Sequence, residues 1–413
     1  MKKICTVVAL LLSLSISLAS CASRNNGESG TLSEDFISTS DTNADSSNED
    51  TSTSGTTNIG SSEEDTSVSD TTDIPEPPAP EIQTVSLLAV GDNLIHGYLI
   101  TAGQTFGFDT YYQRIKDVIS AADIAIINQE SPFTYDSSKY SGYPRFASPT
   151  DVGVAAIEAG FDIFTLATNH TCDKGKQPML DTIDFFKNYP DVTTLGLYET
   201  KDDYNSVKII EKNGIKIALF NYTYGHNQKN PVWWMVDTLT NKDRMISQLE
   251  YAEENADITV VIPHWGTEYK YTPNSTQISW AQFFSDNGAD IIIGHHPHAV
   301  QPVMELTGKN GNTTICYYSL GNFISNQTTL KGNVGGMASL TIVKDENGTR
   351  VEEYQLIPTT VQAQMVNGVR RYEAMLLSDL TPELLKESFK FASNTVDDFW
   401  DLFETASTSY PAK

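Results

Sequence analysis

Val260-Val-Ile-Pro-His264-Trp-Gly-Thr-Glu268 and, one predicted helix later, Asp290-Ile-Ile-Ile-Gly-His295-His296-Pro-His298 decide the fold class. Each segment begins as a short β-branched run and ends abruptly in histidine, a pattern typical of a buried strand. In an open α/β sheet, ligands bind beyond the carboxyl ends of the strands. Because four of the seven histidines lie in this stretch, we expect two strand ends to deliver imidazoles to one place.

The same unit, an apolar run with a polar end followed by an amphipathic helix, recurs from residue 81 onward. We expect strands that end in polar groups over 82–90, 124–127, 163–168, 215–220, 258–262, 291–293 and 315–320. Helical periodicity is expected between them, over 111–121, 151–159, 178–188, 242–255 and 275–287. This alternation predicts an α/β domain with a mostly parallel sheet covered by helices.

The segment after residue 335 has a different pattern. Apolar runs over 338–344 and 351–357 flank Asp345-Glu-Asn-Gly348, which predicts an antiparallel hairpin. The tail over 381–403 has helical periodicity. We expect the hairpin and this helix to pack on the edge of the same domain, so that residues 81–413 form one folded unit.

The N-terminus has the pattern of a secretory signal. Lys2 and Lys3 precede an apolar run over 4–18, which is too short to span a membrane, and Leu-Ala-Ser-Cys21 follows. This ending is similar to the bacterial lipoprotein box, in which the cysteine is lipidated; an ordinary cleavage site is the alternative. Residues 1–21 are therefore predicted to be a lipoprotein signal peptide, and the mature protein an extracytoplasmic lipoprotein of the cell membrane, held by acyl chains on Cys21.

Residues 22–80 are rich in Ser, Thr, Asp and Glu, and we expect a disordered linker there. Of the formal net charge of −26, this linker carries −12 and the two lysines of the leader +2, which leaves −16 for residues 81–413. A strongly acidic domain is a poor nucleic-acid binder, and we exclude nucleic acid as a partner. Whether Cys172 and Cys316 pair stays open.

The predicted strand ends carry Asp, Glu, Asn and His, without a cysteine cluster. This mixed oxygen and nitrogen set suits Mn, Fe, Zn or Mg in an open site better than a closed structural zinc site. Two ions about 3.5–4 Å apart can clamp a phosphoryl group between bridging carboxylates and terminal imidazoles. Asp92, Glu130, His264 and His298 provide both kinds of group, so one or two divalent ions are predicted.

Six motifs in this order resemble the CapA proteins of capsule or poly-γ-glutamate biosynthesis, in the calcineurin-like metallophosphatase superfamily. They are Gly91-Asp92, Asn128-Gln-Glu130, Asn169-His170, His264-Trp-Gly-Thr-Glu268, Gly294-His-His-Pro-His298 and Ser319-Leu-Gly-Asn-Phe323. The resemblance covers about Val85 to Phe323. It implies a four-layer α/β/β/α metallophosphatase-like sandwich with the metal site at one sheet edge, to which the C-terminal hairpin and helix would be added. The superfamily's Asp-x-His on the first strand is absent, which leaves one ion or two as alternatives.

The resemblance also implies residue roles. The metal ligands would be Asp92, Glu130, Asn169, His264 and His298. For one further ligand His295 and His296 are alternatives, and we favour His296. His170 would act as the acid that protonates the leaving group, beside Asn169 and Asp92 in the catalytic group. Contacts to substrate or ligands are expected from Asn128, Glu268, His295, Asn322 and Arg145.

Each of these residues has a structural alternative. Asp92 could form a turn, Asn169 and Glu130 could satisfy loop backbone groups, and His170 could be a packed loop histidine. Glu268 could orient His264 or be solvated, and Arg145 could be an ordinary surface arginine. His96 and His226 lie in predicted loops without a second motif, and we expect neither to be a ligand.

Two classes of function follow. The first is a surface-anchored CapA-type protein with a metal-dependent phosphoesterase-like hydrolase site, acting on an anionic capsular polymer or a phosphoester. The second is a catalytically silent subunit that binds the polymer or serves as a scaffold in a membrane capsule synthase. A general surface nucleotidase or nuclease ranks last, because the sequence has no basic or base-stacking signal.

Overall fold

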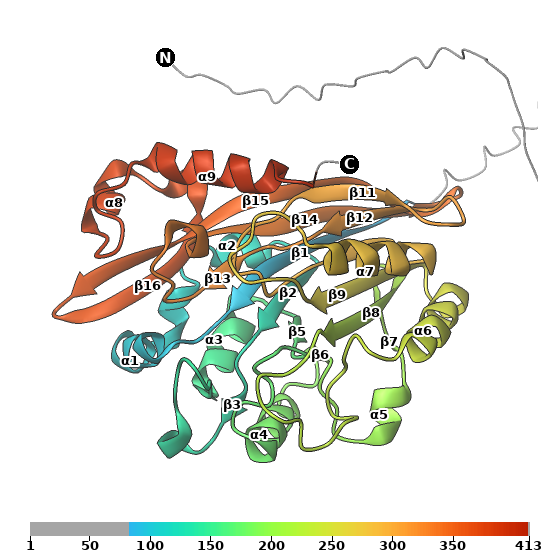
Figure 1. The fold of residues 1–413 in the computed structure, drawn as a ribbon, viewed down its shortest axis with the longest axis horizontal. Coiled ribbons are helices and arrows are strands. Elements are labelled where there is room, and N and C mark those ends of the chain that lie inside the picture. The colour runs from blue at the N-terminus through green and yellow to red at the C-terminus, as the bar shows by residue number, and fades with distance from the viewer. Residues whose placement is uncertain (1–81, 412–413) are drawn as a thin grey trace, which may run out of the picture. The chain divides into compact units, whose positions relative to one another are not determined.

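The computed structural model describes residues 82–411 (Figure 1). The predicted signal peptide with Cys21 and the predicted linker over 22–80 lie outside the described residues. Within residues 82–411, none of the helices combines the length and the apolar composition that crossing a membrane requires.

The first sheet is built around β1, which is followed in the sheet by β2, β5 and β6, all parallel to it. On its other side β14, β15 and β16 continue the sheet in antiparallel order, and β13 pairs in parallel with the end of β1. In sheet order the bounds are Val369–Leu376 (β16), Gly348–Val366 (β15), Val334–Asp345 (β14), Gln83–Asn93 (β1), Ile124–Gln129 (β2), Ile163–Thr165 (β5) and Thr193–Leu195 (β6), with Asn322–Ile324 for β13.

The second sheet has the order β11–β12–β10–β9–β8–β7, with a parallel centre and an antiparallel strand at each edge. The bounds in that order are Val303–Thr307, Thr313–Tyr317, Ile291–Ile293, Ile258–His264, Ile215–Thr223 and Lys208–Lys212. The short strands β3 (Phe133–Thr134) and β4 (Ser148–Pro149) form a separate parallel pair.

The two sheets face each other across a layer of aliphatic side chains. Leu87 and Ile126 from the first sheet meet Leu219, Val260 and Ile293 from the second, each at most 2 % exposed. Burying a side chain of this size contributes about 1.5–3 kcal/mol. This layer explains why β9 and β10 have continuous apolar runs: each is buried on both faces.

Helices cover the outer faces of both sheets. The first sheet is covered by α1 (Gly97–Phe106), α2 (Lys116–Ser120), α3 (Asp151–Ala159) and α4 (Lys176–Phe186). The second is covered by α6 (Lys242–Asn255) and α7 (Ser275–Asp286), while α5 (Lys201–Asn205) connects β6 to β7. Short 3₁₀ turns lie at Phe108–Tyr111, Ser137–Lys139, Leu330–Gly332 and Leu377–Asp379. The predicted four-layer α/β/β/α sandwich is therefore confirmed.

Most predicted helices are confirmed within two residues, and the predicted helix over 111–121 is shorter. It divides into the 3₁₀ turn Phe108–Tyr111 and α2, and residues 112–115 between them form turns. The tail over 381–403 is likewise two helices, α8 (Pro382–Glu387) and α9 (Val396–Thr408), each with a threonine N-cap. The threonines Thr381 and Thr395 accept backbone N–H groups, and they mark the two starts in the sequence.

The predicted C-terminal hairpin is confirmed, and with β16 it forms one edge of the first sheet, beyond β1. Asp345 pairs with Gly348 across the turn, and β14 runs antiparallel to β1 from Gln83 to Val90, so the hairpin extends the first sheet outward from β1. A third strand, β16, extends it further. Helices α8 and α9 pack on this extension through Leu385, Phe399 and Phe403, as Figure 1 shows above β15.

Four strands are preceded by an aspartate that binds the neighbouring strand. In each case a carboxylate oxygen accepts a backbone N–H at 2.7–2.9 Å; the pairs are Asp123 with Ser86, Asp162 with Ala125, Asp257 with Lys216, and Asp290 with Thr259. The repeated Asp-Ile at strand entrances thus satisfies amides at the start of the sheets.

Replacing Asp290 with asparagine should raise the free energy of unfolding at about pH 8 and change it little near pH 4. Burial raises the pKa of Asp290 from 3.8 to about 7, so between these values the unfolded chain has released a proton that the folded chain retains. Stability from the protonated carboxyl is therefore complete below pH 3.8 and is lost as the pH rises through about 7.

The expected gain is on the order of 2 kcal/mol, and it is measured by chemical denaturation at both pH values. The asparagine oxygen can still accept the N–H of Thr259, which keeps the strand entrance intact. A gain of the same size at both pH values would contradict this account, because it would not depend on ionisation.

Candidate metal centre

Polar side chains of the first sheet converge where β1 and β2 end. Asp92 pairs with Asn128 in the register of the two strands and with Asn322 of β13 on its other side, while Glu130 follows directly after β2. Asp92, Asn128 and Glu130 are fully buried. The parallel register therefore places two carboxylates and two amides at one sheet edge.

The second sheet delivers the imidazoles to the same edge. His264 is the last residue of β9, and a β-bridge joins it to His295 beyond the end of β10. His296 and His298 have φ angles of 93° and 52°, which are unusual for residues other than glycine. Holding a residue at such backbone angles costs about 1–3 kcal/mol, and residues of this kind are concentrated at functional sites. The unusual turn brings three histidines within four residues to face the first sheet.

Asp92 is held by contacts from both sheets. Its Oδ1 accepts a hydrogen bond from Asn128 Nδ2 at 2.8 Å, and its Oδ2 lies 2.9 Å from His298 Nδ1. His295 Nδ1 lies 3.5 Å from Asp92 Oδ1. Burial raises the pKa of Asp92, but the hydrogen bonds and charges of His295 and His298 outweigh burial and hold that pKa well below its usual value. Asp92 is therefore a carboxylate in this setting.

Glu130 lies between two groups of ligating atoms. Its Oε1 is 3.5 Å from His264 Nε2 and 3.6 Å from His298 Nε2. On the first side, Asn169 Oδ1 is 2.9 Å from His264 Nε2; on the second, Asp92 and Asn322 flank His298 Nδ1. Ligand atoms of Glu130, His296 and His298 all lie within 4.8 Å of one another, a spacing that could hold a metal ion.

The unpartnered atoms of this cluster fit a cation. Both oxygens of Glu130, Nδ1 of His296 and both ring nitrogens of His295 are buried without a hydrogen-bond partner. Burial raises the pKa of Glu130 to about 7 and lowers the pKa of His264 and His296 well below the usual value. Orphaned buried acceptors are costly, whereas a divalent ion would satisfy carboxylate and neutral imidazole ligands together.

A cavity of about 310 Å³ opens onto His170 and His298. His170 Nδ1 lies 2.7 Å from Asp173 Oδ2, which also accepts the N–H of Phe146, and the Phe146 ring packs edge-on against the imidazole at 4.6 Å. These contacts fix the ring while one side faces the cavity. We did not predict the role of Asp173, although the spacing His-x-x-Asp in Asn169-His170-Thr-Cys-Asp173 was the available signal.

The other residues predicted to contact substrate or ligands differ in their burial. Asn322 is buried against His298, and Glu268 is exposed and lines the cavity, so Glu268 faces the ligand side. Arg145 is exposed and lies outside the cavity lining, although its neighbours Pro144 and Phe146 belong to it.

The two histidines that we expected not to be ligands are not in the group that could hold a metal. His96 lines the cavity wall, with its Nδ1 3.1 Å from Leu94 O, and His226 is half-buried near Asn230. The two domain cysteines, Cys172 and Cys316, are both buried and free.

The structure also brings Tyr224 to the site, which the sequence analysis missed. Its ring centre lies 4.6 Å from that of His296, and its side chain is 44 % exposed. Tyr224 follows β8, and its N–H donates to the carbonyl of His264. It belongs to the same group of strand-end residues as the predicted ligands.

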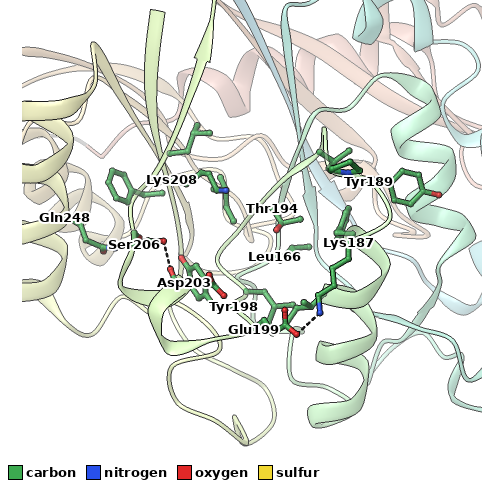
Figure 2. Close-up of a pocket in the computed structure, with 18 residues that line it drawn as sticks. Leu166, Lys187, Tyr189, Thr194, Tyr198, Glu199, Asp203, Ser206, Lys208 and Gln248 are labelled. Atoms are coloured by element: carbon green, nitrogen blue, oxygen red, sulfur yellow. Dashed lines mark hydrogen bonds and ion pairs between the residues drawn. The ribbon is translucent and has the colours of Figure 1, made fainter.

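Figure 2 shows a different cavity, of about 280 Å³, between the strands at the β6 and β8 side of the sandwich. Leu166 and Thr194 lie inside it, and the ion pair Lys187–Glu199 lies near its mouth. None of the predicted site residues lines this cavity, so it is separate from the metal centre.

Replacing Gly294 with alanine should destabilise the protein and disturb the histidine turn. A Cβ at this position would overlap the carbonyl of Tyr318 and come within 2.6 Å of Trp265 Nε1, both in rigid surroundings. Overpacking of this kind costs roughly 1–3 kcal/mol. Thermal unfolding should show a lower midpoint, whereas the matched change Gly225→Ala, which has open space around its Cβ, should not. Equal midpoints for the two variants would contradict the close approach.

Comparison with known proteins agrees with this geometry. The family described as "Bacterial capsule synthesis protein PGA_cap" matches residues 86–327. The PGA biosynthesis protein CapA of Bacillus subtilis is 28 % identical over 308 residues, which cover 72 % of this chain and 77 % of the relative. The capsule biosynthesis protein CapA of Bacillus anthracis is 27 % identical over 296 residues, covering 68 % and 69 %.

Solved structures with a related fold include a phosphatase from Mycoplasma pneumoniae and a putative 5′-nucleotidase from Staphylococcus aureus. The first is 15 % identical, with a TM-score of 0.42 over 67 % of this chain and 94 % of that one. The second is 18 % identical, with a TM-score of 0.41 over 67 % and 54 %.

The family match includes Asp92, Glu130, Asn169, His170, His264 and the histidine turn. The chain therefore belongs to the PGA_cap family of bacterial capsule synthesis proteins.

Proposed function

We propose that this protein acts in the synthesis or export of an anionic capsular polymer of the poly-γ-glutamate type, with a metal-dependent hydrolase site at the sheet edge. The observation that carries the proposal is the orphaned set of buried polar atoms on Glu130, His295 and His296 beside a cavity. The signal-like N-terminus ending at Cys21 supports a location on the outer face of the membrane, where a polymer would be exported or attached.

The metal would be held by Glu130, His296 and His298, with Asn169 and His264 on one side of Glu130 and Asp92 on the other. When bound, a divalent ion supplies Lewis-acid polarisation of a phosphoryl or carbonyl oxygen. These residues do not by themselves select Mn, Fe, Zn or Mg, because all four accept oxygen and nitrogen ligands.

The chain's own groups would position the substrate and move a proton. His170, oriented by Asp173 and by the Phe146 ring, faces the cavity and would donate a proton to the leaving group from its Nε2. Tyr224, Tyr269 and Glu268 border the space in which the reacting group would lie. The depth of His264 and Glu130, both 0 % exposed, keeps bulk water from the ligands.

The test is a metal and turnover assay on the purified protein. Metal content is measured by inductively coupled plasma mass spectrometry after loading with each of Mn, Fe, Zn and Mg, and turnover is followed with a chromogenic phosphodiester and with poly-γ-glutamate. Metal bound in a simple ratio to protein, with release of product from either substrate, is the expected result. A loaded protein that turns over neither substrate would contradict the hydrolase site and would favour a polymer-binding subunit of a membrane synthase.

A further inference from the structure

Two cations share one aromatic ring beside the cavity, and neither pairs with a carboxylate in the described part of the chain. The Arg370 guanidinium lies 3.6 Å from the centre of the Tyr98 ring and 4.9 Å from that of Phe389. Lys390 Nζ lies 5.8 Å from the Phe389 centre and 5.2 Å from that of Tyr372. The ion pairs formed among residues 82–411 include neither Arg370 nor Lys390.

This arrangement is electrostatically unfavourable as it stands. Burial, together with the nearby charge of Arg370, lowers the pKa of Lys390 to about 7. Like charges held together in a partly desolvated place repel each other, and a bound anion would remove the repulsion. Among residues 82–411, no carboxylate forms an ion pair with either cation.

The cation pair is connected to the cavity by short contacts. Lys390 Nζ donates to the carbonyl of Gln327 at 2.9 Å, and Gln327 Nε2 donates to the Tyr269 hydroxyl at 2.9 Å. Gln327 and Tyr269 line the cavity together with His170 and His298. Lys390 therefore contacts Gln327, a residue that lines the cavity.

A third cation, Lys331, contacts Tyr269 of the same cavity lining. Lys331 Nζ is 3.4 Å from the carbonyl of Tyr269 and 5.1 Å from the centre of the Tyr271 ring, and no carboxylate in the described part of the chain pairs with it. Figure 1 shows α1, which carries Tyr98, beside β16, which carries Arg370. Arg370, Lys390 and Lys331 all lie outside the segment 86–327 that the family matches.

We propose that Arg370, Lys390 and Lys331 form a carboxylate-binding subsite for the part of an anionic polymer that extends beyond the reacting group in the cavity. The inference rests on the proposed function, since it assigns the same substrate to a second region. Guanidinium and ammonium groups bind carboxylates through charge-assisted hydrogen bonds. The rings of Tyr98, Tyr372 and Phe389 hold the cations in place from behind, which lowers the entropy lost when the polymer binds.

Binding of a fluorescently labelled poly-γ-glutamate oligomer to the full chain tests the subsite without requiring turnover. Arg370→Gln and Lys390→Met should each weaken binding by about tenfold, the equivalent of one charge-assisted contact, and added salt should reduce the difference. The matched control is Lys242→Gln: Lys242 also lies over aromatic rings, 4.9 Å from Trp280 and from Phe283, but on α6. The Lys242→Gln variant should bind the oligomer as tightly as the unchanged protein does.

A second measurement needs no substitution. Acylation of lysines, followed by peptide mass spectrometry, should show Lys390 and Lys331 protected by the oligomer and Lys242 unprotected. Protection of Lys390 and Lys331 but not of Lys242 supports the subsite even if Lys390→Met folds poorly.

The outcomes separate this inference from the proposed function. If the oligomer binds and the Arg370 and Lys390 variants bind it equally well, the subsite is wrong and the hydrolase proposal is untouched. If these variants lose binding while the protein turns over no substrate, the subsite stands and the hydrolase proposal fails. Binding to vesicles of anionic lipid in place of the oligomer, or binding to neither, overturns the subsite.

Discussion

Replacing His298 with alanine should lower metal affinity by more than about 100-fold, since loss of an outer contact to a ligand alone costs 10–100-fold. His298 Nε2 faces Glu130 at 3.6 Å, while its Nδ1 contacts Asp92 at 2.9 Å and Asn322 at 3.0 Å. Burial lowers the pKa of His298, but the charges of Glu130 and Asp92 outweigh it and raise that pKa to about 10. Removing the ring therefore leaves two buried carboxylates without their shared partner.

Metal content after dialysis against limiting chelator measures this effect. His226→Ala is the control, because His226 is a half-buried histidine outside the cluster, and it should keep the metal. Circular dichroism must show that the His298 variant is folded. A folded His298→Ala protein that retains metal as tightly as the His226→Ala protein would exclude the ligand set around Glu130.

Replacing His170 with alanine should lower turnover by about 10²–10⁴-fold and leave metal content unchanged. The expected loss is the usual contribution of a positioned general acid. His170 faces the cavity and contacts Asp173 instead of Glu130 or Asp92, so the metal centre should not depend on it. Initial rates with the substrate that the unchanged protein accepts, together with metal analysis of the same samples, measure both quantities.

Asp173→Asn separates the proton donor from its orientation. Asparagine can still accept the N–H of Phe146, but it removes the carboxylate that contacts the imidazole, so turnover should fall less than in His170→Ala. Restoration of capsule production by His170→Ala in a strain that lacks the gene would argue against a catalytic role for His170. It would support a binding or scaffolding role for the whole protein.

Local patterns were sufficient for the central strands and for most helices of the domain, whereas β6, β7, β11, β13 and β16 were not predicted. The β-branched runs that end at His264 and before His295 are buried on both faces, and burial of a strand requires such a run wherever it occurs. The sequence did not predict that the hairpin over 338–357 pairs with β1, because a strand's own periodicity does not encode which neighbouring strand it hydrogen-bonds to. Pairing of β14 with β1 joins residues about 250 positions apart, and such contacts depend on the whole sheet.

The sequence by itself determined which residue types stand at the strand ends, because polar groups after apolar runs are a local property of the chain. Only the tertiary structure decided that Glu130 lies between His264 and His298, and that His296 and His298 adopt left-handed backbone angles toward the first sheet. It also decided that Arg370 and Lys390 meet at one phenyl ring. These distances join side chains from separate elements, and they are fixed by the register of the strands and the packing of two sheets, which no single segment contains.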